Sequence, residues 1–212
     1  TDRLELSMDI IEALASDDSL FERADGSRWN GFGFAIQAYQ KRAISLCDWA
    51  AELARSHGRL FFIRLVKGAY WDSEIKLSQM GGYSDYPVFT RKVTTDVSYQ
   101  ACAKRLFQHS DVIFPAFATH NAYTIGAVKA LSDGRPFEFQ RLHGMGGEIY
   151  DALGKVEGEN RTPVRIYAPV GGHKQLLAYL VRRLLENGAN TSFVNRVANQ
   201  MVPVKELLAD PV

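Results

Sequence analysis

The sequence is poor in cysteine, carries almost no net charge and contains no long apolar run. Cys47 and Cys102 are its only cysteines, and two thiols far apart in helical patterns indicate neither a disulfide framework nor a metal site. The formal net charge of +1 gives no strong attraction to nucleic acid or lipid. No stretch is apolar enough to span a bilayer, and no signal-peptide pattern opens the chain. We therefore expect a cytoplasmic protein, with peripheral membrane contact left open.

Several common motifs of catalysis are also missing. There is no Walker phosphate loop, no dinucleotide glycine fingerprint, no metal-ligand cluster and no nucleophile elbow. Cys102 lies in the middle of a helical pattern, which favours a core position over a nucleophile. Candidate chemistry must therefore come from other residues.

The 212 residues are 46% hydrophobic and 23% charged, which suits a globular protein with one core. Short runs rich in Phe, Ile, Val and Tyr alternate with helical patterns. Strands are predicted at 33–39, 60–66, 112–118, 137–143 and 164–168, with a weaker one at 191–194. Helices are predicted at 41–57, 73–80, 91–109, 122–132, 148–153 and 173–187, the last closed by Gly188.

This alternation predicts an α/β fold with a parallel sheet and right-handed crossovers. Five strand–helix units are present, whereas a closed barrel needs eight strands. An open five-stranded sheet and a barrel short of three strands both fit. The amphipathic helix that begins at Leu4, with no strand before it, favours the barrel and predicts further chain upstream of Thr1. Residues 16–29 are polar and are predicted to form a surface loop.

The strand at 60–66 ends in charged and aromatic residues. A buried parallel strand is normally apolar throughout. Arg64, Lys67, Gly68, Tyr70 and Trp71 depart from that rule where the strand gives way to a loop. Sites in α/β folds form at the carboxyl ends of the strands, so this segment predicts a binding site.

Three other strands place polar residues at the same end. Gln37 closes one strand, Thr119, His120 and Asn121 follow another, and His143 follows a third. A lone histidine at a strand end is usually structural. The recurrence at four strands is stronger evidence for a ligand than any single motif.

The helix at 173–187 carries a polar stripe made of Tyr179, Arg182, Arg183 and Glu186. The stripe fits either a solvated surface or a clamp for a carboxylate or phosphate, and spacing alone does not decide. Gly171-Gly172 before the helix likewise fit either an anion site or a plain turn. The opposite face is apolar and comprises Leu177, Leu180, Val181, Leu184 and Leu185.

Segments 64–72, 117–121, 142–146, 165–171 and 179–187 together resemble the proline dehydrogenase domain of the bacterial proline utilization A enzymes. The resemblance covers nearly the whole chain, in order. It implies a (βα)8 barrel that holds FAD, oxidises L-proline to Δ1-pyrroline-5-carboxylate and passes electrons to membrane quinone. Residues 1–212 would form the C-terminal part of one such domain, namely strands four to eight. In full-length members the barrel is fused to an NAD-dependent aldehyde dehydrogenase domain.

The resemblance also assigns roles to individual residues. Arg64 would lie beside the hydride-accepting nitrogen of the flavin, and Arg182 and Arg183 would clamp the proline carboxylate. The proline ring would be lined by Tyr70, Leu142, Tyr167 and Tyr179. The cofactor would be held by Gln37, Arg64, Val66, Lys67, Gly68, Trp71, Thr119, His120, Asn121, Arg183, Glu186 and Phe193.

The sequence departs from the family pattern at its beginning. An active-site aspartate of the third strand and a lysine of the second would both precede Thr1. The chain alone is therefore expected to be an incomplete catalyst that aggregates or binds flavin poorly. Two alternatives remain: a non-catalytic barrel remnant that binds an anionic metabolite or partner through the arginine stripe, and a phosphate-handling barrel that uses Gly171 and Gly172.

Overall fold

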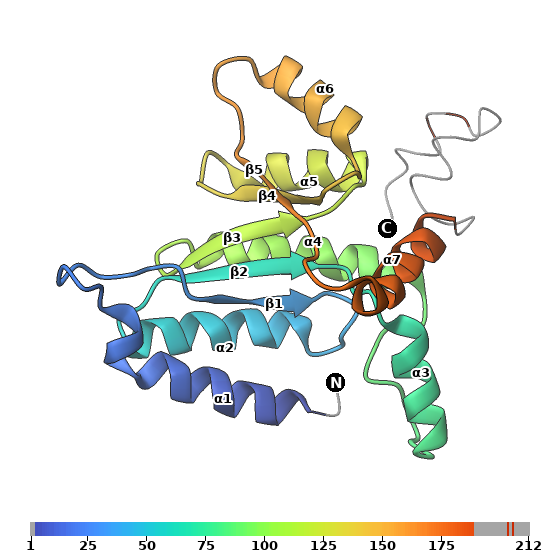
Figure 1. The fold of residues 1–212 in the computed structure, drawn as a ribbon, viewed down its shortest axis with the longest axis horizontal. Helices are drawn as coiled ribbons and strands as arrows, with labels where there is room; N and C mark the ends of the chain where they lie inside the picture. Colours follow the sequence, from blue (N-terminus) through green and yellow to red (C-terminus); the bar gives the residue numbers. More distant parts are fainter. Residues whose placement is uncertain (1–2, 189–202, 204, 206–212) are drawn as a thin grey trace. The chain divides into compact units, whose positions relative to one another are not determined.

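The computed structural model describes residues 3–188, 203 and 205. It has an α/β fold with a parallel sheet in the order β1-β2-β3-β4-β5 (Figure 1). The elements are α1 (Leu4–Ser16), the 3-10 helix η1 (Asp18–Phe21), β1 (Gly33–Gln37), α2 (Ala43–Ser56), β2 (Phe61–Val66), α3 (Trp71–Met80), α4 (Lys92–Gln108), β3 (Ile113–Ala118), α5 (Ala122–Ser132), β4 (Glu138–Leu142), α6 (Gly147–Glu157), β5 (Val164–Tyr167) and α7 (His173–Gly188).

The five main strand predictions and the helix predictions are confirmed, with small shifts at the ends. The predicted end of α6 at residue 153 was wrong, because Gly154 continues the helix and packs beside the guanidinium of Arg161. The loop prediction for 16–29 was wrong in part, since η1 forms there and buries Phe21. The weak strand at 191–194 lies outside the described residues.

The described chain divides into two compact units. The first contains the described residues up to Phe117 together with Leu131–Phe137. The second contains Ala118–Ala130 and the described residues from Glu138 onward.

In the first unit, helices cover one face of β1, β2 and β3. Ile36, Ile63, Leu65 and Phe117 point to that face and are almost completely buried, and α2 and α4 pack against the strands and against each other. The opposite face is more open, because Ala35 is exposed and the alternate residues of β2 are only partly buried. Burial of one face therefore fixes which residues of each strand remain accessible.

Cys47 on α2 and Cys102 on α4 are fully buried free thiols. Although they are far apart in the sequence, the structure brings them together. A hydrogen bond with Cys102, together with burial, raises the pKa of the Cys47 thiol. The same hydrogen bond lowers the pKa of Cys102. Both side chains are fully buried, which agrees with a core position for both cysteines.

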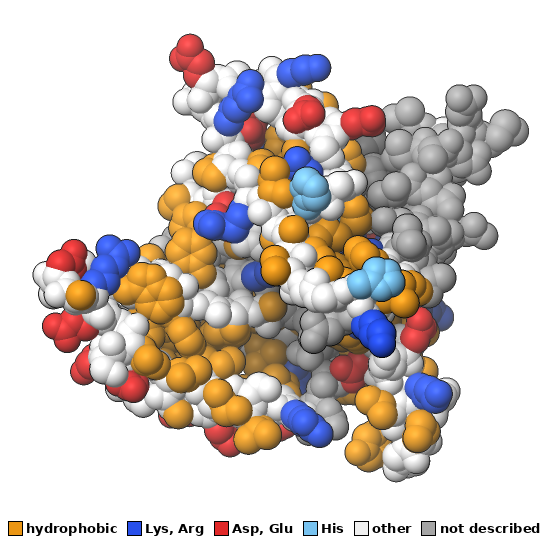
Figure 2. Space-filling view, in the orientation of Figure 1, with side chains coloured by type: hydrophobic (Ala, Val, Ile, Leu, Met, Phe, Trp, Pro, Cys, Tyr) orange, Lys and Arg blue, Asp and Glu red, His pale blue; other side chains and the backbone are white. Residues whose placement is uncertain are grey.

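Helix α1 has apolar side chains on two of its faces. Ala15 is buried, whereas Leu6, Ile10 and Leu14 are exposed along the helix, where Figure 2 shows hydrophobic side chains at the surface. Among the described helices, none combines the length and apolar character needed to cross a membrane.

In the second unit, a buried glutamate on β4 forms an ion pair with an arginine on β5. The Glu138 carboxylate is buried and accepts two hydrogen bonds from Arg165, at 2.7 and 2.8 Å, and one from Gln140 at 2.7 Å. Burial alone would raise the pKa of Glu138, but the Arg165 and Gln140 hydrogen bonds outweigh it and hold that pKa below its ordinary value. The carboxylate therefore stabilises the fold only while it is ionised and paired.

We predict that Arg165→Met lowers the free energy of unfolding by about 1–2 kcal/mol at pH 7. Without the cation, burial dominates and Glu138 takes up a proton more readily. The difference from the parent should therefore narrow as the pH falls toward 4, because the variant gains this proton while the lowered pKa of Glu138 keeps the parent's carboxylate ionised. Urea unfolding at both pH values measures this.

Arg161→Met is the control, because Arg161 is exposed and its Nε donates only to the Gly158 carbonyl. An equal loss for Arg165→Met at both pH values would contradict the role assigned to the ion pair.

Candidate functional site

The register of the first three strands places Arg64 between two alanines. In the parallel pairing, Ala35 of β1 and Ala116 of β3 both lie opposite Arg64 of β2. Paired residues of a parallel sheet project from the same face, so Arg64 lies on the face opposite α2 and α4, with an alanine beside it on each neighbouring strand. Neither alanine side chain is long enough to crowd the guanidinium group within the sheet.

Gln37 and Val66 form the next layer of that face. They are paired in register at the carboxyl ends of β1 and β2. The chain after each strand continues the pairing, since the amides of Ala38 and Tyr39 donate to the carbonyls of Val66 and Lys67 at 2.8 and 2.9 Å. Both predicted residues thus lie at one strand edge with Arg64.

Gly68 approaches the ring of Tyr39 very closely. It has a φ of 126°, and a Cβ atom there would lie 2.5 Å from a ring carbon of Tyr39. Only glycine fits this position without a shift of the buried tyrosine. Burial raises the pKa of Tyr39, and its hydroxyl oxygen has no hydrogen-bond partner among the described residues.

Lys67 forms a partly buried ion pair with Asp96 of α4, and Lys92 donates to the same carboxylate at 2.8 Å. Burial lowers the pKa of Lys67, and Asp96 opposes that shift. Burial alone would raise the pKa of Asp96, but the two lysines bring it below its ordinary value. Asp96 therefore keeps a cation at the end of β2.

Tyr70 and Trp71 begin α3 and are both exposed. The indole N–H of Trp71 donates to the Phe89 carbonyl at 2.9 Å, which ties the start of α3 to the segment before α4. This hydrogen bond holds the Trp71 ring in place, and both rings remain accessible to solvent.

In the second unit, residues 119–121 connect β3 to α5. Asn121 accepts from the amide of Thr124 at 2.9 Å, and its own amide donates to the Thr119 hydroxyl at 3.2 Å. The first contact is a side-chain cap of the kind that begins helices. Tyr150 of α6 donates its hydroxyl to the Thr119 carbonyl at 2.7 Å. The segment is therefore held from both sides.

His120 accepts a hydrogen bond at Nε2 from the amide of Leu142, at 3.3 Å. Burial lowers the pKa of His120, and the positive charges of Arg141 and Arg183 lower it further. The structure thus brings three predicted site residues, His120, Leu142 and Arg183, into one neighbourhood of the second unit.

Leu142 and Tyr167 are paired in register at the ends of β4 and β5. The amide of His143 donates to the Tyr167 carbonyl at 2.8 Å, which extends the pairing past the strands. Leu142 is buried and Tyr167 is partly buried. The two residues that were predicted to line a small ring therefore share one face of the sheet.

On α7 the polar stripe is more covered than the apolar one. Tyr179, Arg182 and Arg183 are partly buried, and the Arg183 guanidinium lies 5.3 Å from the centre of the Tyr179 ring. By contrast, the described apolar residues Leu177, Leu180 and Val181 are between 43% and 53% exposed. This orientation is the reverse of that of an ordinary surface helix, which buries its apolar face. The side chain of Glu186 and all of Phe193 lie outside the described residues.

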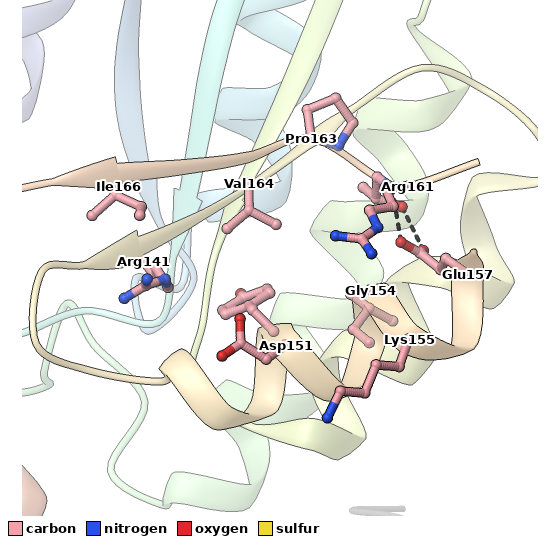
Figure 3. Close-up of a pocket in the computed structure, with 12 residues that line it drawn as sticks. Arg141, Asp151, Gly154, Lys155, Glu157, Arg161, Pro163, Val164 and Ile166 are labelled. Atoms are coloured by element: carbon pink, nitrogen blue, oxygen red, sulfur yellow. Dashed lines mark hydrogen bonds between the residues drawn. The ribbon is translucent and has the colours of Figure 1, made fainter. Parts of the chain in front are cut away.

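A cavity of about 600 Å³ lies elsewhere in the second unit, between α6 and β5 (Figure 3). Its lining includes Arg141, Asp151, Glu157, Arg161 and Ile166. None of the predicted site residues lines it. Within the part of the chain that the structure describes, no group of His, Cys, Asp or Glu side chains could hold a metal ion.

A family model described as proline dehydrogenase matches residues 1–196. The chain belongs to the proline dehydrogenase family. It is 56% identical over 217 residues to the bifunctional protein PutA of Klebsiella aerogenes, covering all of this chain and 16% of that protein. A crystal structure of proline utilization A from Bradyrhizobium japonicum superposes with a TM-score of 0.91 at 55% identity, over 99% of this chain and 21% of that one. The structure from Bdellovibrio bacteriovorus, inactivated by N-propargylglycine, gives 0.89 at 34% identity.

Some residues that contact the predicted site residues were not themselves predicted from the sequence. Asp96, Tyr150 and Gly146 support Lys67, Thr119 and His120 respectively. Gly146 belongs to segment 142–146, which carries part of the family resemblance, so the sequence did contain a signal that could have identified it. Asp96 and Tyr150 lie inside ordinary helical patterns, where nothing in the sequence distinguishes them.

We predict that Asp96→Asn lowers the free energy of unfolding by about 1–3 kcal/mol at pH 7, because Lys67 stays buried without a carboxylate. The pKa of Lys67 should fall further in the variant. The folded variant then releases its proton at a lower pH than the unfolded chain, so its stability recovers as the pH rises toward 10. Urea unfolding at pH 7 and 10 tests this.

Asp111→Asn removes a surface carboxylate that pairs with Arg55 and serves as the control. Because arginine stays protonated, the effect of this control should not shrink at pH 10. A pH-independent loss in Asp96→Asn would contradict the assignment of Lys67.

Proposed function

We propose that this chain carries the FAD and substrate site of an enzyme that oxidises L-proline to Δ1-pyrroline-5-carboxylate, the first step of proline breakdown to glutamate. Membership of the proline dehydrogenase family over residues 1–196 supports the reaction class. The names of the PutA relatives support a bifunctional parent.

One observation carries the substrate assignment. On helix α7, Arg182 and Arg183 are partly buried, whereas Leu177 and Leu180 are exposed. A surface helix normally does the reverse. Two adjacent guanidinium groups offer planar donors that suit a carboxylate. The Tyr179 ring against Arg183 adds an apolar wall for the rest of a small amino acid.

The donors present also suit FAD. Lys67, Thr119, His120 and Asn121 offer an ammonium, a hydroxyl, a ring N–H and an amide, the groups that bind diphosphate and ribityl oxygens. The close approach of Gly68 to Tyr39 fixes the backbone at the end of β2, next to Lys67. We assign the remaining cofactor contacts to Gln37, Val66, Trp71, Arg183, Glu186 and Phe193.

The chemistry that FAD supplies when bound is acceptance of a hydride from the proline ring carbon next to nitrogen. The residues of the chain orient the reactants and place charge. Arg64, between Ala35 and Ala116, provides a positive charge on the open face of β2. Arg182 and Arg183 fix the carboxylate and so select the ring carbon that reacts. Leu142, Tyr167, Tyr179 and Tyr70 line the ring.

We further propose that residues 1–212 are the C-terminal part of a (βα)8 barrel and supply its strands four to eight. The chain spans 16% of the PutA relatives and 21% of the solved chains that it matches. This agrees with fusion to an aldehyde dehydrogenase domain. Electrons would leave for a membrane quinone, so the parent enzyme would be cytoplasmic and bind peripherally to the inner membrane.

We predict that Arg182→Met and Arg183→Met raise KM for proline about tenfold or more, because each removes a charge-assisted bond to the carboxylate. FAD content per chain should change far less. The measurement is steady-state reduction of an artificial electron acceptor by the complete polypeptide that contains this chain, together with flavin absorbance.

Arg161→Met, at an exposed position away from α7, should leave both quantities unchanged. Unchanged proline kinetics in both α7 variants would remove the clamp assignment. Calorimetry on flavin-free protein tests the alternative, because tight binding of tetrahydrofuran-2-carboxylate without flavin would favour a non-catalytic anion-binding barrel.

A further inference from the structure

The hydrogen bond at His120 fixes which ring nitrogen carries the proton. Nε2 lies 3.3 Å from the amide nitrogen of Leu142, and a backbone amide can only donate. Nε2 must therefore present its lone pair, which leaves the proton of the neutral ring on Nδ1. Because the other nitrogen is committed to the backbone, Nδ1–H is the ring's hydrogen-bond donor.

Gly146 supports the same ring from the side. A Cβ atom at Gly146 would lie 2.7 Å from Cδ2 of His120, so the bare backbone of this glycine packs against the imidazole. Its φ of 66° is a left-handed conformation, and it caps the start of α6. Sterics and backbone geometry thus both require glycine here.

The surrounding elements hold the segment that carries His120. Tyr150, in the first turn of α6, donates its hydroxyl to the carbonyl of Thr119, and burial raises the pKa of that hydroxyl, so it remains a donor. The amide of Tyr150 bonds the carbonyl of Gly146 at 3.2 Å. One loop and one helix turn therefore contact both Thr119 and His120.

We propose that the loop between β4 and α6 is a positioning device that presents His120 as a neutral Nδ1–H donor to a diphosphate ligand. Gly146 and the Leu142 amide are its positioning groups. This inference rests on the proposed function for the identity of the ligand, which we take to be FAD. It gives the backbone of segment 142–146 a role in cofactor binding, namely to orient His120, which the oxidation of proline does not by itself require.

The charges near the ring agree with a neutral donor. Arg141 on β4 and Arg183 on α7 are the charged groups that act on His120, and both are cations. A protonated imidazole beside them would be repelled. The arginine charges attract the ligand, and His120 supplies direction through one hydrogen bond.

A matched pair of variants tests the positioning. Gly146→Ala and Gly144→Ala both place a side chain at a left-handed residue, but a Cβ at Gly144 meets no atom within 4 Å. Both variants therefore share the backbone strain, and only Gly146→Ala displaces His120. Diethyl pyrocarbonate reacts with unprotonated imidazole nitrogens, and peptide mass spectrometry reports its reaction at each histidine.

In flavin-free protein, His120 should react about tenfold faster in Gly146→Ala than in the parent or in Gly144→Ala, because Nε2 loses its amide partner. The exposed His143 and His173 calibrate the reagent. Equal labelling of His120 in the two alanine variants would overturn the role of Gly146.

FAD titration of the complete polypeptide tests the ligand. We expect Gly146→Ala to weaken FAD binding about tenfold relative to Gly144→Ala. His120→Asn, whose amide can replace Nδ1–H, should bind FAD more tightly than His120→Gln, whose amide lies where Nε2 does. Equal affinities within both pairs would overturn the proposal. If the parent itself binds no FAD, the proposed function fails, and the labelling result still decides whether Gly146 positions His120.

Discussion

In a parallel sheet, residues that are paired in register project from the same face, and this constraint determines the chemistry of the first unit. Gly33, Ala35 and Gln37 pair with Phe62, Arg64 and Val66. The alternate residues are apolar, and Ile36, Ile63 and Leu65 among them are buried under α2 and α4. A shift of one residue would bury Arg64 among these core side chains and expose the core. The hydrophobic face therefore also fixes the position of this cation.

Two charged side chains that are partly or fully removed from water in this chain have partners that maintain their charge. Asp96 keeps Lys67 protonated, and Arg165 keeps Glu138 ionised. His120 shows the opposite arrangement, because its neighbours favour the neutral ring. The surroundings of each side chain thus select its protonation state. The residues that support a side chain therefore matter for its charge even where they would not contact a ligand.

The sequence predicted most of the fold because the strands are short apolar runs and helices fill the intervals between them. It also singled out Arg64 as a candidate site residue, since a cation inside an apolar strand is unusual. The support from Asp96 could not be predicted, because a carboxylate on α4 looks like any solvated residue until the end of β2 lies beside it. The contact between Cys47 and Cys102 was missed for a similar reason: it depends on how α2 packs against α4. On α7 the periodicity separated the two faces correctly, but only the packing determines that the arginine face is the covered one.

The contact between Leu142 and His120 also matters for crystallographic refinement. At ordinary resolution, electron density does not distinguish the nitrogen and carbon atoms of an imidazole, and two orientations related by a flip fit equally well. The backbone amide of Leu142 removes this ambiguity, because only one orientation directs a nitrogen toward it. The ring at residue 120 can therefore be oriented in a map before any ligand is fitted.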